Sequence, residues 1–302
     1  MHDIIIIGGG PAGLTAAIYA RRAGKTALVI EKETFGGQIT FSPKVENIPG
    51  FTALSGNEFA EKLVEQALEQ GADMESAEVT GIDGSEIKTV HTDGGDYETK
   101  AVIVATGAKH RHLGLAREDD FIGEGISFCA VCDGAFYKGK DVAVVGGGNS
   151  ALQEALLLAD QARHVTVVQN LDFLTGEKAL ADLLTARENV TVILGTVVDA
   201  YLGEKELTGL RLKKEADGST QEITVSGVFL AVGLVPQNEP FADIIALDGR
   251  GYAASGEDCL TGSKGVYVAG DCRAKKIRQV TTAAADGAVA ALAACDYLDG
   301  RA

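Results

Sequence analysis

The sequence is short of basic residues and of long apolar runs. Lysine and arginine number 27 against 43 aspartate and glutamate residues, a net charge of −16, which argues against nucleic acid or an anionic membrane surface as a partner. No apolar run approaches the roughly 20 residues that are needed to cross a bilayer. The opening residues MHDIIIIGGG lack the basic segment of a secretory signal. These absences predict a cytoplasmic protein with no membrane or nucleic-acid partner.

Cysteine is scarce, and only one pair of cysteines has a recognisable spacing. The odd count of 5 in a chain of 302 residues does not indicate a disulfide scaffold. Cys129 and Cys132 form a Cys-x-x-Cys pair, whereas Cys259, Cys272 and Cys295 are interpreted as structural. A structural zinc site needs four ligands, and neither a second Cys-x-x-Cys nor a suitably spaced histidine pair is present. We therefore predict no metal site.

A strand, a glycine-rich turn, a helix and a second strand occur twice along the chain. The first such unit runs from the isoleucines of residues 3–7 through GGGPAG to TALVIEK, and the second from DVAVVGGGNSALQEALLLAD to VTVVQN. This duplication predicts an α/β protein with two Rossmann-like dinucleotide-binding domains, each of three layers around a mainly parallel sheet. We expect residues 1–113 and 239–302 to form one domain, and residues 114–238 a second domain inserted in it.

Each glycine loop follows a strand and opens a helix, the context in which a G-x-G-x-x-G pattern has physical meaning. The first position permits a tight turn, the second lets the backbone approach a pyrophosphate, and the third lets the helix pack closely on the strand. In that order the residues are Gly8, Gly10 and Gly13 in the first unit, and Gly146, Gly148 and Ala151 in the second.

The two units differ at the end of the second strand. Glu31 lies 23 positions after Gly8 (31 − 8), and Gln169 lies 23 positions after Gly146 (169 − 146). A carboxylate at this position accepts hydrogen bonds from the ribose hydroxyls of a dinucleotide, and the neutral Gln169 can still bond a ribose. The segment after Gln169 contains two acids and no arginine before Lys178, a poor pocket for a 2′-phosphate. This favours NADH over NADPH.

The Cys-x-x-Cys pair can be half of a zinc site, a structural disulfide or a redox dithiol. A permanent disulfide across two residues would close a very small loop and save little chain entropy, which favours the redox dithiol. A dithiol needs an electron source, and a flavin can take hydride from a nicotinamide and pass the electrons to a disulfide. The first site would then hold FAD and the second the nicotinamide nucleotide. Asp133 could donate or accept the proton, or could simply form the turn before Gly134.

At these residues the chain resembles the low-molecular-weight thioredoxin reductases, nearly from end to end. The shared segments are GGGPAGLTAAIYARRAG, GGQI, ENIPGF, ATGA, CAVCDGAF, VVGGGNSA, GVYVAGDC and RQVTTAAADG. The resemblance implies an FAD enzyme that uses NAD(P)H to reduce thioredoxin, assembles as a homodimer and carries its cysteines in the nicotinamide domain. It also implies that Cys132 contacts the flavin, Cys129 attacks the thioredoxin disulfide and Asp133 is the acid.

The same resemblance implies a set of cofactor-binding residues. Asp271 would bond the ribityl and pyrophosphate region of FAD, whereas Gln38 and Asn47 would line the flavin pocket or, alternatively, only cap loops. Near the isoalloxazine ring the resemblance places Arg278, Gln279 and Val280. The other residues that the resemblance implies to bind a cofactor are Pro11, Ala12, Gly37, Thr106, Gly107, Asn149, Ser150 and Gly270.

One motif of the family is missing from the chain. The family binds the 2′-phosphate with His-Arg-Arg-x-x-x-Arg, where this chain has QNLDFLT at residues 169–175. The alternatives are a same-fold reductase that takes electrons from ferredoxin, one that serves a peroxiredoxin-type partner, and a small-molecule dithiol oxidase. Because the GGGNSA loop is intact, a nicotinamide nucleotide is favoured over ferredoxin as the electron donor. The intact Cys-x-x-Cys-Asp argues against a non-catalytic flavin-binding sensor.

Overall fold

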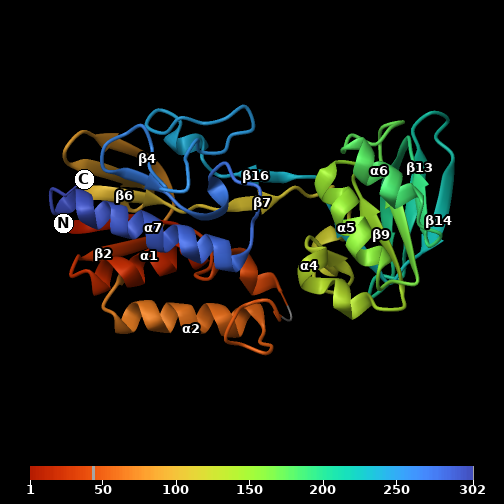
Figure 1. Ribbon diagram of the computed structural model, residues 1–302, viewed down its shortest axis with the longest axis horizontal. Helices are drawn as coiled ribbons and strands as arrows, with labels where there is room; N and C mark the ends of the chain where they lie inside the picture. Colours follow the sequence, from red (N-terminus) through yellow and green to blue (C-terminus); the bar gives the residue numbers. More distant parts are fainter. Residues whose placement is uncertain (43–44, 302) are drawn as a thin grey trace. The chain divides into compact units, whose positions relative to one another are not determined.

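The computed structural model describes residues 1–42 and 45–301 and divides the chain into two compact units. Unit 1 comprises Met1–Lys109 and Val235–Ala302, and unit 2 comprises His110–Leu234 (Figure 1). The chain thus leaves unit 1 once and returns to it once. Both crossings lie four residues before the predicted boundaries (109 against 113, and 234 against 238).

Unit 1 is built on a mixed sheet in the order β3-β2-β1-β6-β5-β4, with β17 paired to β6. Strands β1, β2, β3, β17 and the second half of β6 run parallel, whereas β4 and β5 form antiparallel pairs with the first half of β6. The isoleucines at positions 4–7 are almost fully buried, as expected of a parallel strand that is covered on both faces. The elements of unit 1 are β1 (His2–Ile7), α1 (Pro11–Arg22), β2 (Ala27–Glu31), η1 (Gly37–Phe41), α2 (Gly56–Glu69), β3 (Asp73–Ser76), β4 (Val79–Gly84), β5 (Lys88–Thr92), β6 (Gly95–Val104), η3 (Glu239–Phe241), β17 (Val266–Val268), η4 (Gly270–Cys272) and α7 (Val280–Leu298).

Helices α1 and α7 pack side by side in unit 1 (Figure 1). Both are rich in alanine, which favours helix and allows close approach. The contact is closest at Gly287 of α7, where an added Cβ would lie 2.1 Å from the carbonyl oxygen of Ala12. The last helix of the chain is therefore fixed against the helix that follows the first glycine loop.

Unit 2 contains a five-stranded parallel sheet in the order β11-β10-β9-β15-β8 and a three-stranded antiparallel sheet in the order β12-β13-β14. Helix α5 connects β9 to β10 in the same way that α1 connects β1 to β2. The elements of unit 2 are α3 (Glu118–Phe121), β8 (Ile126–Ser127), α4 (Ala130–Asp133), η2 (Gly134–Tyr137), β9 (Asp141–Val145), α5 (Asn149–Ala159), β10 (His164–Val168), α6 (Lys178–Thr185), β11 (Val190–Ile193), β12 (Thr196–Leu202), β13 (Gly209–Lys214), β14 (Thr220–Thr224) and β15 (Gly227–Leu230).

Two short strands carry the chain across the unit boundary, β7 (Ala108–His110) and β16 (Leu234–Pro236), and they pair with each other. Next to them, the amide of Arg111 donates to the carbonyl of Gly233 at 3.0 Å. The predicted α/β class with two dinucleotide-binding folds, one inserted in the other, is confirmed. Within residues 1–42 and 45–301, every helix is too short or too polar to span a bilayer.

Candidate functional site

The first glycine loop requires glycine for steric reasons. Gly8 has a φ of +108°, and a Cβ added there would lie 2.3 Å from the carbonyl oxygen of Ala105. A Cβ at Gly13 would lie 1.9 Å from the carbonyl oxygen of Gly8. Gly10, by contrast, is open: it forms the N-cap of α1 without a side-chain cap, and the nearest atom to its added Cβ is 3.9 Å away. The loop thus leaves space beside Gly10, at the N-terminus of the helix that begins with Pro11 and Ala12, and a helix N-terminus is where an anion is favoured.

The second loop repeats this geometry in unit 2. Gly146 has a φ of +130°, and its added Cβ would lie 2.5 Å from the carbonyl oxygen of Ala231. Gly148 is the N-cap of α5, and its added Cβ would lie 3.7 Å from the Oγ1 atom of Thr175. Ala151, at the third position of the motif, is fully buried. The duplication inferred from the sequence therefore extends to individual contacts.

In each unit, the residue at the end of the second strand lies against the glycine loop. The Glu31 carboxylate accepts the amide of Gly9 at 2.7 Å and that of Glu33 at 2.8 Å. Gln169 is only 4% exposed, and its Nε2 donates to the carbonyl of Phe173 at 3.3 Å. A Cβ at Gly147 would lie 2.6 Å from the Gln169 Cδ atom, so the glutamine side chain lies directly on the loop.

At the start of α5, Asn149 is held by the loop that precedes α6, and Ser150 is exposed. The Nδ2 of Asn149 donates to the Glu177 carboxylate at 3.1 Å, and its Oδ1 accepts the Glu177 amide at 2.6 Å. Lys178, the first cation after Gln169, is 87% exposed and pairs with Asp182 at 2.9 Å.

Residues from three distant segments meet around the first loop. The amide of Gly36 donates to the carbonyl of Gly9 at 2.7 Å, and a Cβ at Gly37 would lie 3.1 Å from the Gly10 Cα atom. Gly270, with a φ of +80°, approaches α1 so closely that an added Cβ would lie 2.8 Å from the Cβ of Ala12. The predicted cofactor residues 37 and 270 are thus brought to the same helix terminus.

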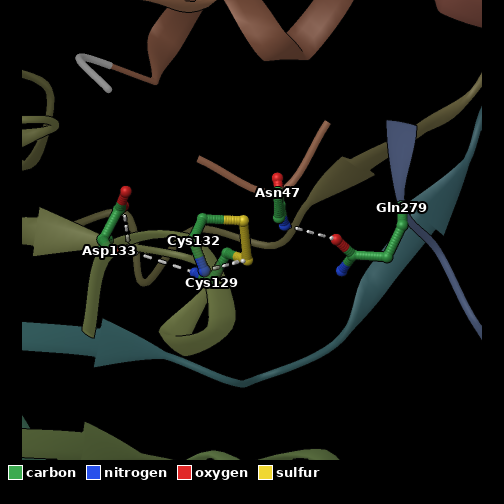
Figure 2. The surroundings of a disulfide bond; sticks show 6 residues. Asn47, Cys129, Cys132, Asp133 and Gln279 are labelled. Carbon is green, nitrogen blue, oxygen red and sulfur yellow. Dashed lines mark hydrogen bonds between the residues drawn. A yellow bond between two sulfur atoms is a disulfide. The ribbon is translucent and has the colours of Figure 1, made fainter. Parts of the chain in front are cut away.

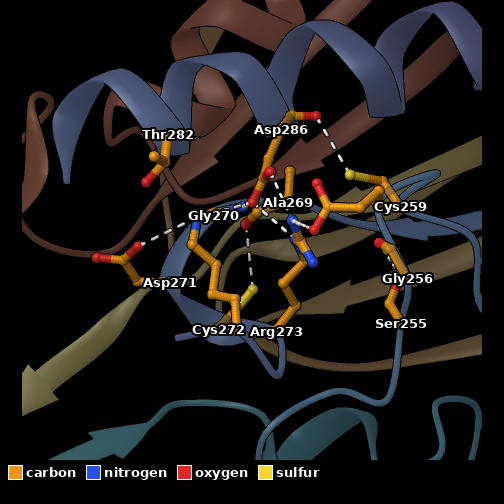
Figure 3. Close-up of polar contacts among 12 residues, drawn as sticks. Ser255, Gly256, Cys259, Ala269, Gly270, Asp271, Cys272, Arg273, Thr282 and Asp286 are labelled. Carbon is orange, nitrogen blue, oxygen red and sulfur yellow. Dashed lines mark hydrogen bonds and ion pairs between the residues drawn. The ribbon is translucent and has the colours of Figure 1, made fainter. Parts of the chain in front are cut away.

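Asp271 follows Gly270 in the loop before α7 (Figure 3). Its Oδ1 is buried without a hydrogen-bond partner in the described part of the chain, although the Lys275 ammonium lies 3.7 Å away. Burial raises the pKa of Asp271, against the opposing effect of Lys275 and Arg278. The Arg278 guanidinium stacks 4.3 Å from the centre of the Tyr252 ring, and its Nε donates to the Asp271 carbonyl at 3.4 Å. A buried acceptor of this kind fits a hydroxyl donor from a ligand.

A buried charge cluster centred on Asp286 holds this loop against α7 (Figure 3). The Asp286 carboxylate accepts both a Nε and a terminal nitrogen of Arg273 at 2.8 Å, the Lys275 ammonium at 2.9 Å and the Gly270 amide at 3.0 Å. Arg273 and Asp286 are almost fully buried. Sequence reasoning missed this cluster.

The remaining residues predicted for unit 1 are held by local contacts. The Gln38 side-chain nitrogen donates to the carbonyl of Ala108, and the Asn47 Nδ2 donates to the Gln279 Oε1 at 3.1 Å (Figure 2). Thr106 donates to the Asn238 side chain at 3.3 Å.

Of the last two predicted residues of unit 1, one begins a helix and the other lies between β6 and β7. Val280 is the first residue of α7 and packs against the buried Val45, Ile48 and Leu54. Gly107 has a φ of +69°, and no atom lies within 4 Å of its added Cβ.

In unit 2, Cys129 and Cys132 form a disulfide at the first turn of α4 (Figure 2). The two cysteines are half-buried, and Val131 between them is 60% exposed. The Ser127 hydroxyl accepts the Cys129 amide at 3.1 Å and donates to Asp133 Oδ2 at 2.6 Å. Ser127, which the sequence did not single out, therefore connects Asp133 to the disulfide turn.

Asp133 is placed to hold a proton. Burial raises the pKa of its carboxyl, whereas the hydrogen bond from Ser127 lowers it. Its Oδ1 is buried and has no partner within the described residues. The other three cysteines are free and buried, and no cluster of metal-ligating side chains occurs over residues 1–42 and 45–301.

Comparisons with known proteins identify the family. Residues 2–287 match the family described as pyridine nucleotide-disulphide oxidoreductase. A thioredoxin reductase from Listeria monocytogenes is 41% identical over 301 residues, which cover 99% of this chain and 94% of the relative. The chain belongs to the low-molecular-weight thioredoxin reductases.

Other relatives span the chain equally fully. The "34.2 kDa protein in rubredoxin operon" of Clostridium pasteurianum is 42% identical over 302 residues, covering 99% of this chain and 98% of the relative. The crystal structure of thioredoxin reductase from Streptococcus pyogenes matches with a TM-score of 0.94 and 37% identity over 99% of both chains. The family resemblance seen in the sequence is confirmed. Membership implies FAD and NAD(P)H as cofactors, and this member carries its redox disulfide in the inserted unit.

Proposed function

We propose that the enzyme moves two electrons from NADH to the Cys129–Cys132 disulfide with the help of FAD, and from the resulting dithiol to thioredoxin. The observation that carries this proposal is the disulfide itself, which lies in the same unit as the second glycine loop. NADH and the disulfide give NAD⁺, one thiol and one thiolate. These two sulfurs, one proton and the thioredoxin disulfide then give the enzyme disulfide and reduced thioredoxin.

The residues of unit 1 fit FAD. The loop of Gly8, Gly10 and Gly13 leads into the N-terminus of α1, which has no side-chain cap and has space beside Gly10, so a pyrophosphate could bind there. Glu31 lies at the position where a carboxylate is expected to accept hydrogen bonds from a ribose. The buried, unsatisfied Oδ1 of Asp271 is suited to accept a hydroxyl of the ribityl chain. When bound, FAD supplies the step that neither partner can perform alone, because it accepts hydride and delivers electrons to a disulfide.

The chain's own residues handle the thiols and the proton. Cys129 is assigned to attack the thioredoxin disulfide, and Cys132 to exchange electrons with the cofactor. Asp133, whose pKa is raised by burial, would hold the proton that the leaving thiolate receives. Ser127 orients Asp133 by donating to its Oδ2 at 2.6 Å.

The nucleotide proposed for the second loop is NADH. Support comes from the absence of arginine at residues 169–175 and from the burial of Gln169 against the loop. The Gln169 Nε2 donates a hydrogen bond to the Phe173 carbonyl, so its Oε1 is left to accept a hydrogen bond from a ribose hydroxyl. A 2′-phosphate would meet Asp172 and no nearby arginine in this segment.

The protein partner proposed is thioredoxin, by analogy with the named relatives. The homodimer and the cytoplasmic location are proposed on the sequence resemblance and the composition alone. Ferredoxin remains the alternative electron donor, because the arginine motif for a 2′-phosphate is missing. One experiment separates the donors. The purified flavoprotein is mixed anaerobically with NADH, NADPH or reduced ferredoxin, and both flavin absorbance and thioredoxin thiols are followed.

We expect NADH to bleach the flavin and to support thioredoxin reduction with the highest kcat/KM. Bleaching by ferredoxin alone would contradict the nicotinamide assignment. Cys129→Ser and Cys132→Ser should each abolish thioredoxin reduction while flavin stays bound, whereas Cys295→Ser, which removes a buried thiol of α7, should not. Turnover that persists in both dithiol variants would refute the mechanism.

A further inference from the structure

Glu154 lies on the face of α5 that packs against the disulfide turn. Ala151, Ala155 and Leu158 are fully buried in one cluster with Ala130 of α4. Glu154 is three positions from Ala151 and four positions from Leu158, so it lies on the same face of the helix as these two residues. The chain therefore places one carboxyl group among alanine and leucine side chains, directly beside the Cys-x-x-Cys turn.

The carboxyl of Glu154 lies near enough to that turn to be influenced by it. The backbone amide of Ala130, the residue that follows Cys129, lowers its pKa. The Oε2 atom is buried and has no hydrogen-bond partner in the part of the chain that the structure describes. An ionised carboxylate is costly in such a place, and an unsatisfied buried oxygen calls for an explanation.

Burial raises the pKa of Glu154 to about 7, against the lowering effect of the Ala130 amide. The ionisable groups on the elements packed against α5 are Asp133 on α4, Tyr137 on η2, Lys178 and Asp182 on α6, Asp141 on β9 and His164 on β10. None of them contributes to this pKa. The two protonation states are therefore balanced near neutral pH, and a new negative charge close by would favour the protonated state.

We propose that Glu154 is a positioning residue of the dithiol, which takes up a proton when the Cys129–Cys132 disulfide is reduced and releases it when the disulfide re-forms. The proposal rests on the redox function proposed above. On reduction the S–S bond accepts two electrons and breaks. One sulfur takes one proton and the other remains a thiolate, while the Glu154 carboxylate takes a second proton from water.

The return step balances in the same way. The dithiol passes two electrons to the thioredoxin disulfide, whose two sulfurs receive one proton from the enzyme thiol and one that Glu154 releases to water. The net charge of the turn is then the same before and after each half-reaction. This matters because two like charges close together in a partly buried site repel each other, so a permanently ionised Glu154 would oppose reduction.

The proposal can be tested by infrared difference spectroscopy of the intact flavoprotein, oxidised and then reduced with dithiothreitol at pH 7.5. Protein labelled with ¹³C in the glutamate carboxyl group separates the side-chain signal from that of the flavin. We expect a protonated-carboxyl band to appear on reduction and to shift with the label. The band should be lost in Glu154→Gln and retained in Glu188→Gln, which removes an equal charge from an exposed position of the same unit.

The outcomes distinguish this proposal from the proposed function. If thiol counting shows that dithiothreitol opens the Cys129–Cys132 pair but no label-sensitive band appears in the wild type, the role of Glu154 is refuted and the redox dithiol stands. A band that persists in Glu154→Gln has the same meaning. If the pair cannot be reduced at all, both proposals fail. The wild-type measurement decides the matter even if Glu154→Gln does not fold.

Discussion

Replacing Asp286 by asparagine would test the buried charge cluster that holds the Gly270–Lys275 loop. Asparagine keeps the size of the side chain but removes the charge that Arg273 and Lys275 face at 2.8 and 2.9 Å. Both cations have side chains that are less than 10% exposed, at 4% and 7%, so they would lose their nearest negative charge and keep only the more distant Glu257, 3.8 Å from Arg273, and Asp271, 3.7 Å from Lys275. Breaking a buried ion pair in this way costs about 3–5 kcal/mol.

The assay is thermal unfolding of the flavoprotein, with Asp182→Asn as the matched control. In a folded unit of this size, about 1 kcal/mol corresponds to about 2–4 °C in Tm, so Asp286→Asn should lower Tm by roughly 6–20 °C. Asp182 pairs with Lys178, and the two side chains are 63% and 87% exposed. Its replacement should cost about 1 kcal/mol or less. Equal shifts for the two variants would refute the reasoning.

The pH dependence gives a second check on the same pair. Burial raises the pKa of Asp286, but hydrogen bonds and charges from Arg273 and Lys275 outweigh it, and the pKa lies below its usual range. The contribution of Asp286 to the free energy of unfolding is therefore complete above the pKa of an unfolded aspartate, and it is lost as pH falls through the native pKa. The difference in Tm between wild type and Asp286→Asn should narrow on acidification.

Three further predictions follow from the two loops and the disulfide turn. Gly8→Ala should release FAD and destabilise the chain by at least about 1–2 kcal/mol, because Gly8 has a positive φ and an added Cβ would lie 2.3 Å from the Ala105 carbonyl oxygen. The control is Gly262→Ala, where no described atom lies within 4 Å of the added Cβ; it should retain flavin absorbance and Tm. Ser127→Ala should move the alkaline limb of the pH profile for thioredoxin reduction to higher pH, because the Ser127 hydrogen bond lowers the pKa of Asp133; an unmoved limb would exclude Asp133 as the acid. The pair Asn170→Arg and Leu171→Arg should raise kcat/KM for NADPH relative to NADH, and an unchanged ratio would show that the 2′-phosphate does not bind at this segment.

The sequence predicted the parts of the site whose geometry is local. Gly8 and Gly146 require a positive φ, and the contacts that exclude a side chain there lie at the end of a neighbouring strand of the same fold. The spacing of Cys129 and Cys132 by itself allows a disulfide in one turn. Local motifs of this kind were therefore enough to predict the fold class, both glycine loops and the dithiol.

The parts that sequence reasoning missed depend on packing between elements. Glu154 became notable only because α4 covers its face of α5, and Asp286 only because two cations of the preceding loop fold onto α7. A signal was present in both cases, namely a single acid on an apolar helical face: Glu154 between Ala151 and Leu158, and Asp286 within an alanine-rich helix. Charged residues that interrupt an otherwise apolar helical face are the positions to examine first in related sequences.

The pairing of β7 with β16 has a consequence for how such a protein can change over evolution. Because the Arg111 amide bonds to the Gly233 carbonyl, the segment 110–234 starts and finishes at neighbouring points. A short join from Lys109 to Val235 would excise that segment without cutting any strand of the sheet that contains β1 and β6. The thiol-bearing unit is thus one continuous segment with neighbouring ends, so it could be replaced as a whole while the rest of the scaffold keeps its connectivity.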